Sequence, residues 1–484
     1  MASLSPAPGS RLVAGVDSST QATKVLVCDA ATGEVLREAR APHPDGSEVD
    51  PEHWWRALRA ASGGGLLEGV AAVAVAGQQH GMVALDAGGT VVRPALLWND
   101  TRSAAAGHDL VEELGGKAAW VAAVGSVPLA AFTVTKLRWL AEHEPEAADR
   151  VEEVVLPHDW VTARLLGGGR RRSVPPGVAT TDRGDVSGTG YWSPATESYR
   201  GDLVARALGR EVGLPRVVPP DGSPGETPDG VLVAAGSGDN MAAALGLAIA
   251  PGDVVVSLGT SGTVFGVHDT PPADPGGAVA GFADATGRFL PLVCTLNAAR
   301  VLGAVARMLG TDLAGLEQLA LAGPPGAAGL ALLPYLDGER TPDLPLATGT
   351  IGGLTRDNAS PEHLARAAVE GMLCGLADGV DALVAQGLEV RRVMLIGGAA
   401  CSAAVQRIAP DLFGAPVTVP APAEYVALGA ARQAAWALAT TRGEEPPSAW
   451  APAADVVSEP VDVVGGAEVR GRYRQLRDAM HPAS

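Results

Sequence analysis

The chain has 484 residues, with 54 acidic and 36 basic side chains and a formal net charge of -18 at pH 7. This acidic balance argues against nucleic acid and anionic membrane surfaces as partners, because both attract positive charge. The length exceeds what one hydrophobic core supports, so we expect two domains, and the 47% hydrophobic and 4% aromatic content is typical of an α/β enzyme.

The N-terminal segment and the cysteines bear on the location of the protein. Residues 1–10 are predicted to be a disordered tail without the apolar segment of a secretory signal, and no stretch is long and apolar enough to span a bilayer. The four cysteines are scattered, without the spacing of metal ligands. A cytoplasmic protein with reduced thiols is the resulting prediction.

The first structured segment is predicted to be a β-hairpin. Apolar strands at 12–16 and 25–28 enclose a polar turn that contains Asp17, Thr20 and Lys24. This chemistry suits Mg²⁺ and phosphate, with Asp17 for a hydrated metal ion, Thr20 for phosphate oxygens and Lys24 as a point charge. An ordinary polar hairpin turn is the alternative interpretation.

A buried strand at 70–76 runs into the polar loop Gly77-Gln78-Gln79-His80-Gly81. Open α/β sheets place substrates at the carboxyl ends of their strands, so Gln79 and His80 are candidates to bind sugar hydroxyls. A loop histidine with satisfied hydrogen bonds is the alternative. Farther along, Trp98 is interpreted either as an apolar wall for a small ligand or as a core residue.

The segment from 235 to 262 organises the second half of the chain. It contains Asp239 and Asn240 in a glycine turn, a small-residue helix at 241–249, a strand at 254–258 and a second turn with Thr260 and Ser261. Small-residue turns expose N–H groups to which phosphate can bind closely, so Asp239 is either a general base that faces a phosphate or the N-cap of the helix. The strand–turn–strand layout of the first hairpin thus returns, which predicts two similar domains with a nucleotide between them.

A third glycine-containing segment follows a buried strand at 393–396. Gly397, Gly398 and Ala399 come directly after this strand, where the missing side chains would let a flat ring lie against the backbone. Adenine is the ligand that this arrangement favours, and a tight αβ turn is the alternative.

Together these motifs, in this order, resemble those of the FGGY carbohydrate kinases, and within them the xylulokinases, from Arg11 onward. The resemblance implies an α/β fold of two actin-like ATPase (ribonuclease-H-like) domains with a catalytic cleft between them. Residues 11–236 would form an N-terminal domain that mainly binds sugar, and residues 237–484 a C-terminal domain that mainly binds ATP. The last helix is a candidate to pack back on the first domain.

The resemblance also implies roles for individual residues. Asp239 would be the general base, and Asp17 would hold Mg²⁺. The sugar would be bound by Gln79, His80, Trp98, Asp239 and Asn240, the phosphates would be faced by Thr20, Lys24, Thr260 and Ser261, and the adenosine would lie along Gly397, Gly398 and Ala399. The sequence departs from the family pattern at Ser19, Gln79 and Ala399, which puts affinity in question rather than reaction type.

The implied activity is ATP-dependent phosphorylation of a pentulose, D-xylulose to D-xylulose 5-phosphate. Another ketose or polyol such as ribulose is the alternative substrate, and a non-catalytic sugar-sensing protein is the alternative class. The expected ligands are a small sugar, ATP and Mg²⁺, and the sequence leaves a homodimer open.

Overall fold

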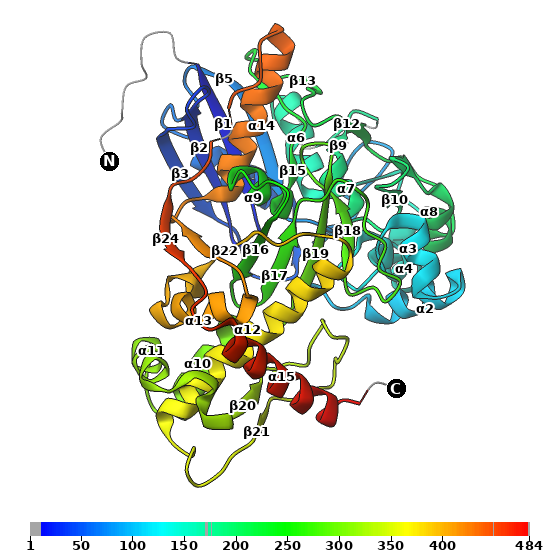
Figure 1. Ribbon diagram of the computed structural model, residues 1–484. Coiled ribbons are helices and arrows are strands. Elements are labelled where there is room, and N and C mark those ends of the chain that lie inside the picture. Colours follow the sequence, from blue (N-terminus) through cyan, green and yellow to red (C-terminus); the bar gives the residue numbers. More distant parts are fainter. Residues whose placement is uncertain (1–10, 170–172, 176, 449, 483–484) are drawn as a thin grey trace.

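The computed structural model describes residues 11–169, 173–175, 177–448 and 450–482, so the predicted tail at 1–10 lies outside the described residues. Two seven-stranded mixed sheets, each with helices packed against it, form the framework of the molecule, which confirms the predicted α/β class (Figure 1).

The first half of the chain contains the following strands: β1 (Leu12–Ser18), β2 (Ala22–Asp29), β3 (Val35–Pro42), β4 (Glu48–Val49), β5 (Val70–Gly77), β6 (Val83–Leu85), β7 (Ala95–Leu96), β8 (Glu153–Val155), β9 (Thr180–Asp182), β10 (Trp192–Ser193), β11 (Ser198–Tyr199), β12 (Arg216–Val218), β13 (Gly225–Glu226), β14 (Leu232–Val233) and β15 (Ser237–Gly238). Its helices are α1 (Glu52–Ala61), α2 (Ala104–Leu114), α3 (Lys117–Val124), α4 (Thr133–His143), α5 (Pro145–Ala148), α6 (Pro157–Leu166), α7 (Arg183–Ser187) and α8 (Gly201–Leu208).

The second half contains the strands β16 (Asp253–Leu258), β17 (Gly262–Gly266), β18 (Ala280–Ala283), β19 (Phe289–Thr295), β20 (Ala331–Leu333), β21 (Thr350–Gly352), β22 (Arg392–Ile396), β23 (Val417–Pro420) and β24 (Ala454–Ser458). Its helices are α9 (Asp239–Gly246), α10 (Ala299–Met308), α11 (Leu313–Ala322), α12 (Pro361–Ala385), α13 (Ala403–Phe413), α14 (Tyr425–Arg442) and α15 (Val463–Met480), with short 3₁₀ turns η1 (Pro325–Gly329) and η2 (Gly398–Cys401).

The two main sheets share a strand order. In the first sheet, β3, β2, β1, β5 and β14 are successive neighbours, and in the second β19, β17, β16, β22 and β23 occupy the corresponding places. Each sheet begins with an antiparallel hairpin whose first strand then pairs in parallel with a later strand, β5 or β22. The prediction of two similar halves is confirmed.

The first hairpin differs in one respect from the prediction. Strand β1 continues through Asp17 and Ser18, so Asp17 lies within the strand, directly opposite Lys24 on β2, rather than in the turn. Opposite charges on facing positions of neighbouring strands attract, which favours this register. The turn itself is reduced to Ser19, Thr20 and Gln21.

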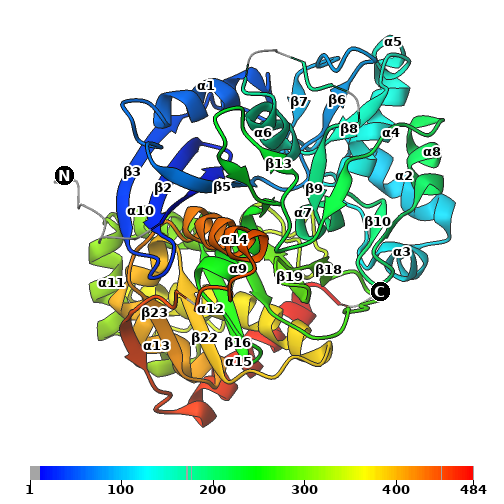
Figure 2. The same cartoon turned by 90° about the horizontal axis from the view of Figure 1, so that it is seen from above.

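Helix α14 joins the two halves. Although it belongs to the second half, it packs against β1 and β5 of the first sheet and against α9, and Figure 2 shows it between the two sheets. The contacts are close: a Cβ atom on Gly15 would lie 1.8 Å from the carbonyl oxygen of Ala427, and one on Gly429 would lie 1.9 Å from that of Ala242. Only glycine allows backbones to approach this closely.

The last helix, α15, does not take this position, so its predicted packing on the first domain is wrong. It lies against α12, α13 and β20. Ion pairs fix it there, because Arg470, Arg474 and Arg477 contact Asp378 and Asp381 of α12.

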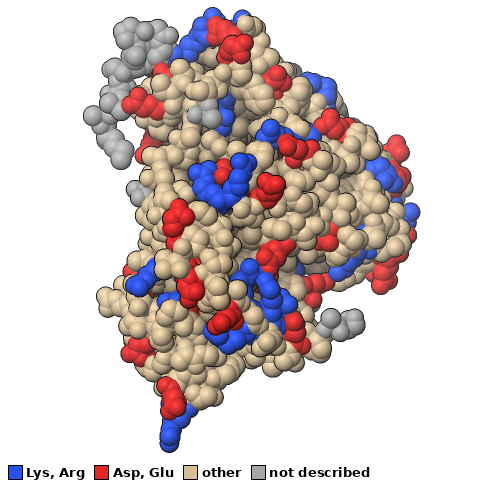
Figure 3. Space-filling model, in the orientation of Figure 1, with Lys and Arg blue, Asp and Glu red and all other residues tan. Residues whose placement is uncertain are grey.

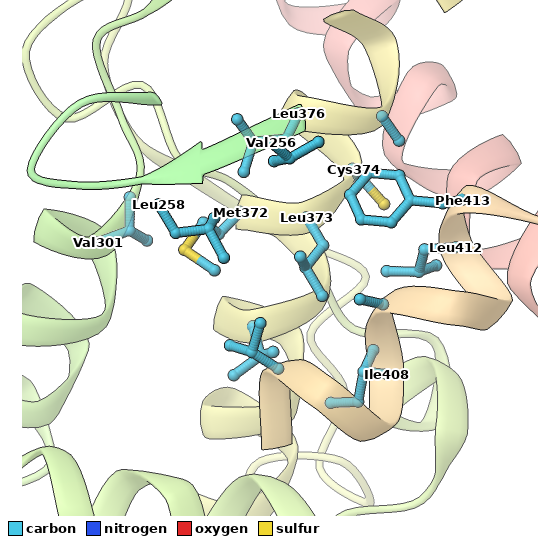
Figure 4. Packing of buried hydrophobic residues seen from close by; sticks show 14 of the residues in the cluster. Val256, Leu258, Val301, Met372, Leu373, Cys374, Leu376, Ile408, Leu412 and Phe413 are labelled. Atoms are coloured by element: carbon cyan, nitrogen blue, oxygen red, sulfur yellow. The ribbon is translucent and has the colours of Figure 1, made fainter. Parts of the chain in front are cut away.

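The core of the second half supports the turn that follows β16. Val256 and Leu258 of this strand pack against Met372, Leu373 and Leu376 of α12, with α10 and α13 closing the cluster (Figure 4). Helix α12 begins with Pro361 at its first position, and the hydroxyl of Ser360 accepts a hydrogen bond from the N–H of His363, a regular start for a long helix.

Acidic and basic side chains are interspersed over the face of the molecule in Figure 3. Among the described residues, no helix is long and apolar enough to cross a membrane.

Candidate active site

Asp239 stands where the chain passes from the first sheet into α9. Strand β15 pairs with the end of β5, and Asp239 follows it as the first residue of α9, with Gly238 as the N-cap. The alternative interpretation of Asp239 as an N-cap is therefore wrong. Its Oδ1 atom accepts hydrogen bonds from the backbone N–H of Asn240 at 2.9 Å and from Nδ2 of Asn240 at 3.0 Å.

Asn240 connects Asp239 to the loop after β5. Its Nδ2 atom also donates to Oε1 of Gln79 at 2.9 Å. Nε2 of Gln79 is buried without a hydrogen-bond partner among the described residues. An unpaired buried amide is costly, so this N–H group is available for a ligand oxygen.

The two carboxyl groups of the site have perturbed pKa values. Burial and the neighbouring charge of Asp17 raise the pKa of Asp239 to about 7. Burial also raises the pKa of Asp17 to about 6, although Lys24 opposes the shift. A carboxyl group that titrates near neutral pH is suited to proton transfer under physiological conditions.

His80 is held in one orientation by its surroundings. The residue has a φ of 68°, its Nδ1 atom lies 2.6 Å from the carbonyl oxygen of Gly188, and its ring stacks on Phe132 at a centroid distance of 4.7 Å. Burial, with the nearby charges of Lys136 and Arg340, lowers its pKa to about 3. The neutral ring therefore donates its Nδ1–H to Gly188, which leaves Nε2 as an acceptor for a hydroxyl group.

Trp98 and Thr20 are joined by a hydrogen bond. The Nε1–H of Trp98 donates to Oγ1 of Thr20 at 2.8 Å, and the Trp98 side chain is 41% exposed, so it is not a core residue. The residue predicted as a sugar wall thus contacts the turn predicted to bind phosphate.

Lys24 lies between two carboxylates. Its Nζ atom is 3.5 Å from Oδ2 of Asp17 and 2.6 Å from Oε2 of Glu424, which precedes α14. The other carboxylate oxygen of Asp17, Oδ1, is buried and has no hydrogen-bond partner among the described residues. An orphaned carboxylate oxygen beside a phosphate-type turn fits a hard cation such as Mg²⁺.

The second turn and the glycine pair lie next to each other. Gly397 has a φ of 90°, and a Cβ atom there would lie 2.8 Å from the carbonyl carbon of Leu258, the last residue of β16. Thr260 and Ser261 follow in the turn to β17 and are exposed and half-buried, respectively. A Cβ atom on Gly398 would meet nothing within 4 Å, so the space in front of this residue is open to a ligand.

Comparison with known proteins identifies the family. The model of the FGGY family of carbohydrate kinases, N-terminal domain, matches residues 12–246, and the model of its C-terminal domain matches residues 254–438. The chain belongs to the FGGY family of carbohydrate kinases.

Named relatives of this carbohydrate kinase agree. The chain is 48% identical to the xylulose kinase of Streptomyces coelicolor over 93% of each chain, and 35% identical to that of Escherichia coli over 83% of this chain and 84% of the other. The crystal structure of xylulose kinase from Bifidobacterium adolescentis superposes with a TM-score of 0.89 at 44% identity, covering 97% of this chain and 99% of that one. The predicted two-domain fold is confirmed, while the predicted division after residue 236 stays a prediction.

The structure of this kinase brings several of the predicted residues into contact. Contacts join Gln79 with Asn240 and Asp239, and Trp98 with Thr20, while Asp17 and Lys24 are paired. The glycine pair after β22 lies next to the end of β16, from which the second turn follows. The roles assigned to these residues remain predictions.

Sequence analysis missed two features of the kinase. The first is Arg340, whose guanidinium makes no hydrogen bond or ion pair with any described residue and whose charge lowers the pKa of His80 and counteracts the raised pKa of Cys294. Its position in a polar loop after β20 was the available signal. The second is a fully buried cluster around His158, which no local pattern reveals.

Proposed function

We propose that this carbohydrate kinase transfers the γ-phosphate of ATP to D-xylulose and produces D-xylulose 5-phosphate and ADP. The observation that supports it most strongly is the constellation of Asp239, Asn240 and Gln79, with its neutral-pH carboxyl group and its unpaired amide, in a chain 48% identical to a xylulose kinase.

Asp239 is proposed to act as the general base. A sugar hydroxyl is a weak nucleophile, so Asp239 accepts its proton while the oxygen forms a bond to the γ-phosphorus and the bond from that phosphorus to the bridging oxygen of ADP breaks. The pKa of about 7 leaves a large ionised fraction of Asp239 at physiological pH while keeping its basicity high. Asn240 keeps the carboxylate oriented through its two hydrogen bonds.

The sugar is proposed to be held by groups with fixed hydrogen-bonding directions. Nε2 of Gln79 donates and Nε2 of His80 accepts, so together they recognise neighbouring hydroxyl groups that each can both donate and accept. The exposed face of Trp98 provides an apolar wall. Because Trp98 is bonded to Thr20, binding of sugar against this wall also orders the first turn.

The phosphates are proposed to be bound by the two hairpin turns. Thr20, Thr260 and Ser261 offer hydroxyl and N–H groups, and Lys24 offers a positive charge once phosphate competes with Glu424 for it. Asp17 would hold Mg²⁺ through its unpaired Oδ1 atom, and the ion would supply neutralisation of phosphate charge. The adenosine lies along Gly397, Gly398 and Ala399, where the open space before Gly398 receives it.

Sugar-dependent ADP release tests this proposal. The purified kinase is assayed with D-xylulose, D-ribulose, glycerol and no sugar, and we expect D-xylulose to give the highest kcat/KM. Asp239→Asn should lower kcat by about 10²–10⁴-fold, the usual contribution of a general base. The matched control is Asp202→Asn, since Asp202 is an exposed carboxylate on α8 that pairs with Arg200, the residue before the helix. Equal rates for Asp239→Asn and wild type would refute the base assignment, and a faster reaction with another sugar would replace the proposed substrate.

A cytoplasmic location stays a prediction, and so does a homodimer. Light scattering on the purified chain measures the mass of the assembly directly, and fractionation of the source cells locates it.

A further inference from the structure

A buried ionic cluster lies directly behind the proposed sugar site. Nδ1 of His158, near the start of α6, is 2.7 Å from Oδ2 of Asp185 on α7 and 3.3 Å from Oδ1 of Asp159. All three side chains have no measurable solvent exposure. No step of the proposed phosphoryl transfer uses them.

The cluster is held from several sides. The second oxygen of Asp159 accepts a hydrogen bond from the N–H of Leu156 at 2.7 Å, and Asp182, which caps α7, accepts from Gly184 at 2.6 Å and Asp185 at 2.9 Å. The ionisable groups that face the cluster are Asp159 on α6, Asp182 and Asp185 at α7, Asp239 on α9, the buried Tyr191 and the half-buried Tyr199.

A positive charge on His158 balances this environment. Burial opposes that charge, but the carboxylates of Asp159, Asp185 and Asp182 outweigh it and raise the pKa of His158 to about 10. Burial also raises the pKa values of Asp159 and Asp185 to about 7, so both carboxylates are ionised only above that pH. The charge of the two carboxylates beside Nδ1 favours the imidazolium form of this ring, although its Nε2 atom is buried without a hydrogen-bond partner among the described residues.

The side chain of His158 also contacts both of the paired segments that carry the sugar-binding residues. A Cβ atom on Gly77 would lie 2.7 Å from Cβ of His158, and one on Gly236 would lie 2.7 Å from Cδ2 of the ring. Gly77 begins the loop that bears Gln79 and His80, and Gly236 precedes Asp239 and Asn240. The two segments therefore rest on one buried side chain.

Helix α7 extends this support to His80 and to the second half. Asp185 lies in its middle, and the helix is followed by Gly188, whose carbonyl oxygen accepts the hydrogen bond from Nδ1 of His80. Ser187, at its end, accepts a hydrogen bond from the N–H of Ala283 on β18 at 3.1 Å. A shift of α7 would therefore break the hydrogen bond to Gly188 that holds His80 in its Nδ1–H tautomer.

We propose that His158, as an imidazolium held by Asp185 and Asp159, is a positioning residue of the kinase that fixes the sugar-binding loops and, through α7, the orientation and tautomer of His80. It touches neither substrate nor nucleotide. The kinetic part of this inference rests on the proposed function, whereas the charge of His158 and the tautomer of His80 can be measured without any substrate.

Two-bond ¹H–¹⁵N spectra of the full chain labelled with ¹⁵N-histidine provide that measurement. The chain has nine histidines, and His158→Gln and His80→Gln assign the two signals of interest. At pH 8, where Asp159 and Asp185 are ionised, we expect both nitrogens of His158 to be protonated, and His80 to show only the Nδ1–H tautomer, the less common form in solution. In Asp185→Asn, the pKa of His158 should fall below 8, and His80 should show both tautomers.

Steady-state kinetics supply the second readout. Asp185→Asn and His158→Gln should each raise the KM for sugar at least tenfold while the KM for ATP stays within twofold. His158→Lys, which keeps a cation, should remain within about threefold of the wild-type KM for sugar. Asp202→Asn should change neither constant.

Several results would overturn the inference. One is a neutral His158 at pH 8 in the wild type, and another is a stoichiometric metal ion bound by the cluster, detected by elemental analysis of the dialysed protein. A third is a folded Asp185→Asn variant with unchanged KM for sugar and an unchanged His80 tautomer. If Asp185→Asn does not fold, the wild-type spectra and the comparison of His158→Lys with His158→Gln decide. Absence of ketose phosphorylation by the wild type would refute the proposed function but leave the spectral test intact.

Discussion

Replacement of the proposed base should make the protein more stable at alkaline pH. The pKa of Asp239 is raised from 3.8 to about 7, chiefly by burial, so the folded chain binds this proton more tightly than the unfolded chain does. The stability associated with that proton is complete below the unfolded pKa of about 4 and is lost as the pH rises through about 7. The side-chain amide introduced by Asp239→Asn is neutral at every pH, and its oxygen can still accept both hydrogen bonds from Asn240.

The size of this effect follows from the shift. Three pKa units at about 1.4 kcal/mol each give an upper value of about 4 kcal/mol. Because the carboxyl group of Asp239 is half-buried rather than fully enclosed, solvent screening reduces this to about 1–2 kcal/mol. For a domain of this size, each kcal/mol raises Tm by about 3 °C.

Thermal unfolding of wild type, Asp239→Asn and Asp202→Asn at pH 5 and pH 8 tests the reasoning. We expect Asp239→Asn to have a higher Tm than wild type at pH 8, with a smaller difference at pH 5. Asp202→Asn should show no gain, because its ion pair with Arg200 lowers the pKa of Asp202 instead of raising it. The reasoning would be refuted if the Tm of Asp239→Asn did not exceed that of wild type at pH 8, or if the gain in Tm were equal at both pH values. Either result would show that burial of the ionised carboxylate does not destabilise the fold.

Three other predictions concern activity and the nucleotide site. The kcat/KM for sugar should rise about tenfold per pH unit up to about 7 and then level off, because the base must be ionised; an acid limb near pH 4 would contradict the shifted pKa. Trp98→Phe removes the donor to Thr20 and should raise the KM for sugar several-fold with little change in Tm, whereas Thr20→Ser, which keeps the acceptor, should leave that KM nearly unchanged. Gly397→Ala should lower stability by about 1–3 kcal/mol because of its positive φ and its contact with β16, whereas Gly398→Ala should keep its Tm but raise the KM for ATP; equal Tm losses would argue against the open space.

The sequence predicts the framework of this kinase because the decisive signals are local. Apolar runs separated by polar turns identify both hairpins, and the strand before Gly397 is as predicted. The local pattern could not show that β1 continues through Asp17, because that extension depends on pairing with Lys24 across the hairpin. Tertiary pairing, rather than local preference, decides such strand ends.

The contacts between distant segments could not be predicted in this way. Lys24 and Glu424 are 400 positions apart, and the partners His158 and Asp185 lie on two helices, one of which has only five residues. Each of these side chains is unremarkable in its local sequence, and its environment exists only after the chain has folded. The candidate residues for sugar and phosphate were found because they lie in recognisable motifs, whereas the residues behind them lie in none.

The crossing of α14 with the first sheet and with α9 has a consequence for how variants of this kinase should be interpreted. The contact is made by backbone atoms at Gly15 and Gly429. Even one added methyl group would therefore push α14 or α9 out of place, and with α9 the proposed base would move relative to the strand that bears Asp17. A mutational scan scored only by turnover would therefore mark these two positions as severely as the residues that touch ligands. Measurements of ligand affinity on such variants, rather than rates alone, would distinguish a changed packing of α14 between the two halves from a damaged binding pocket.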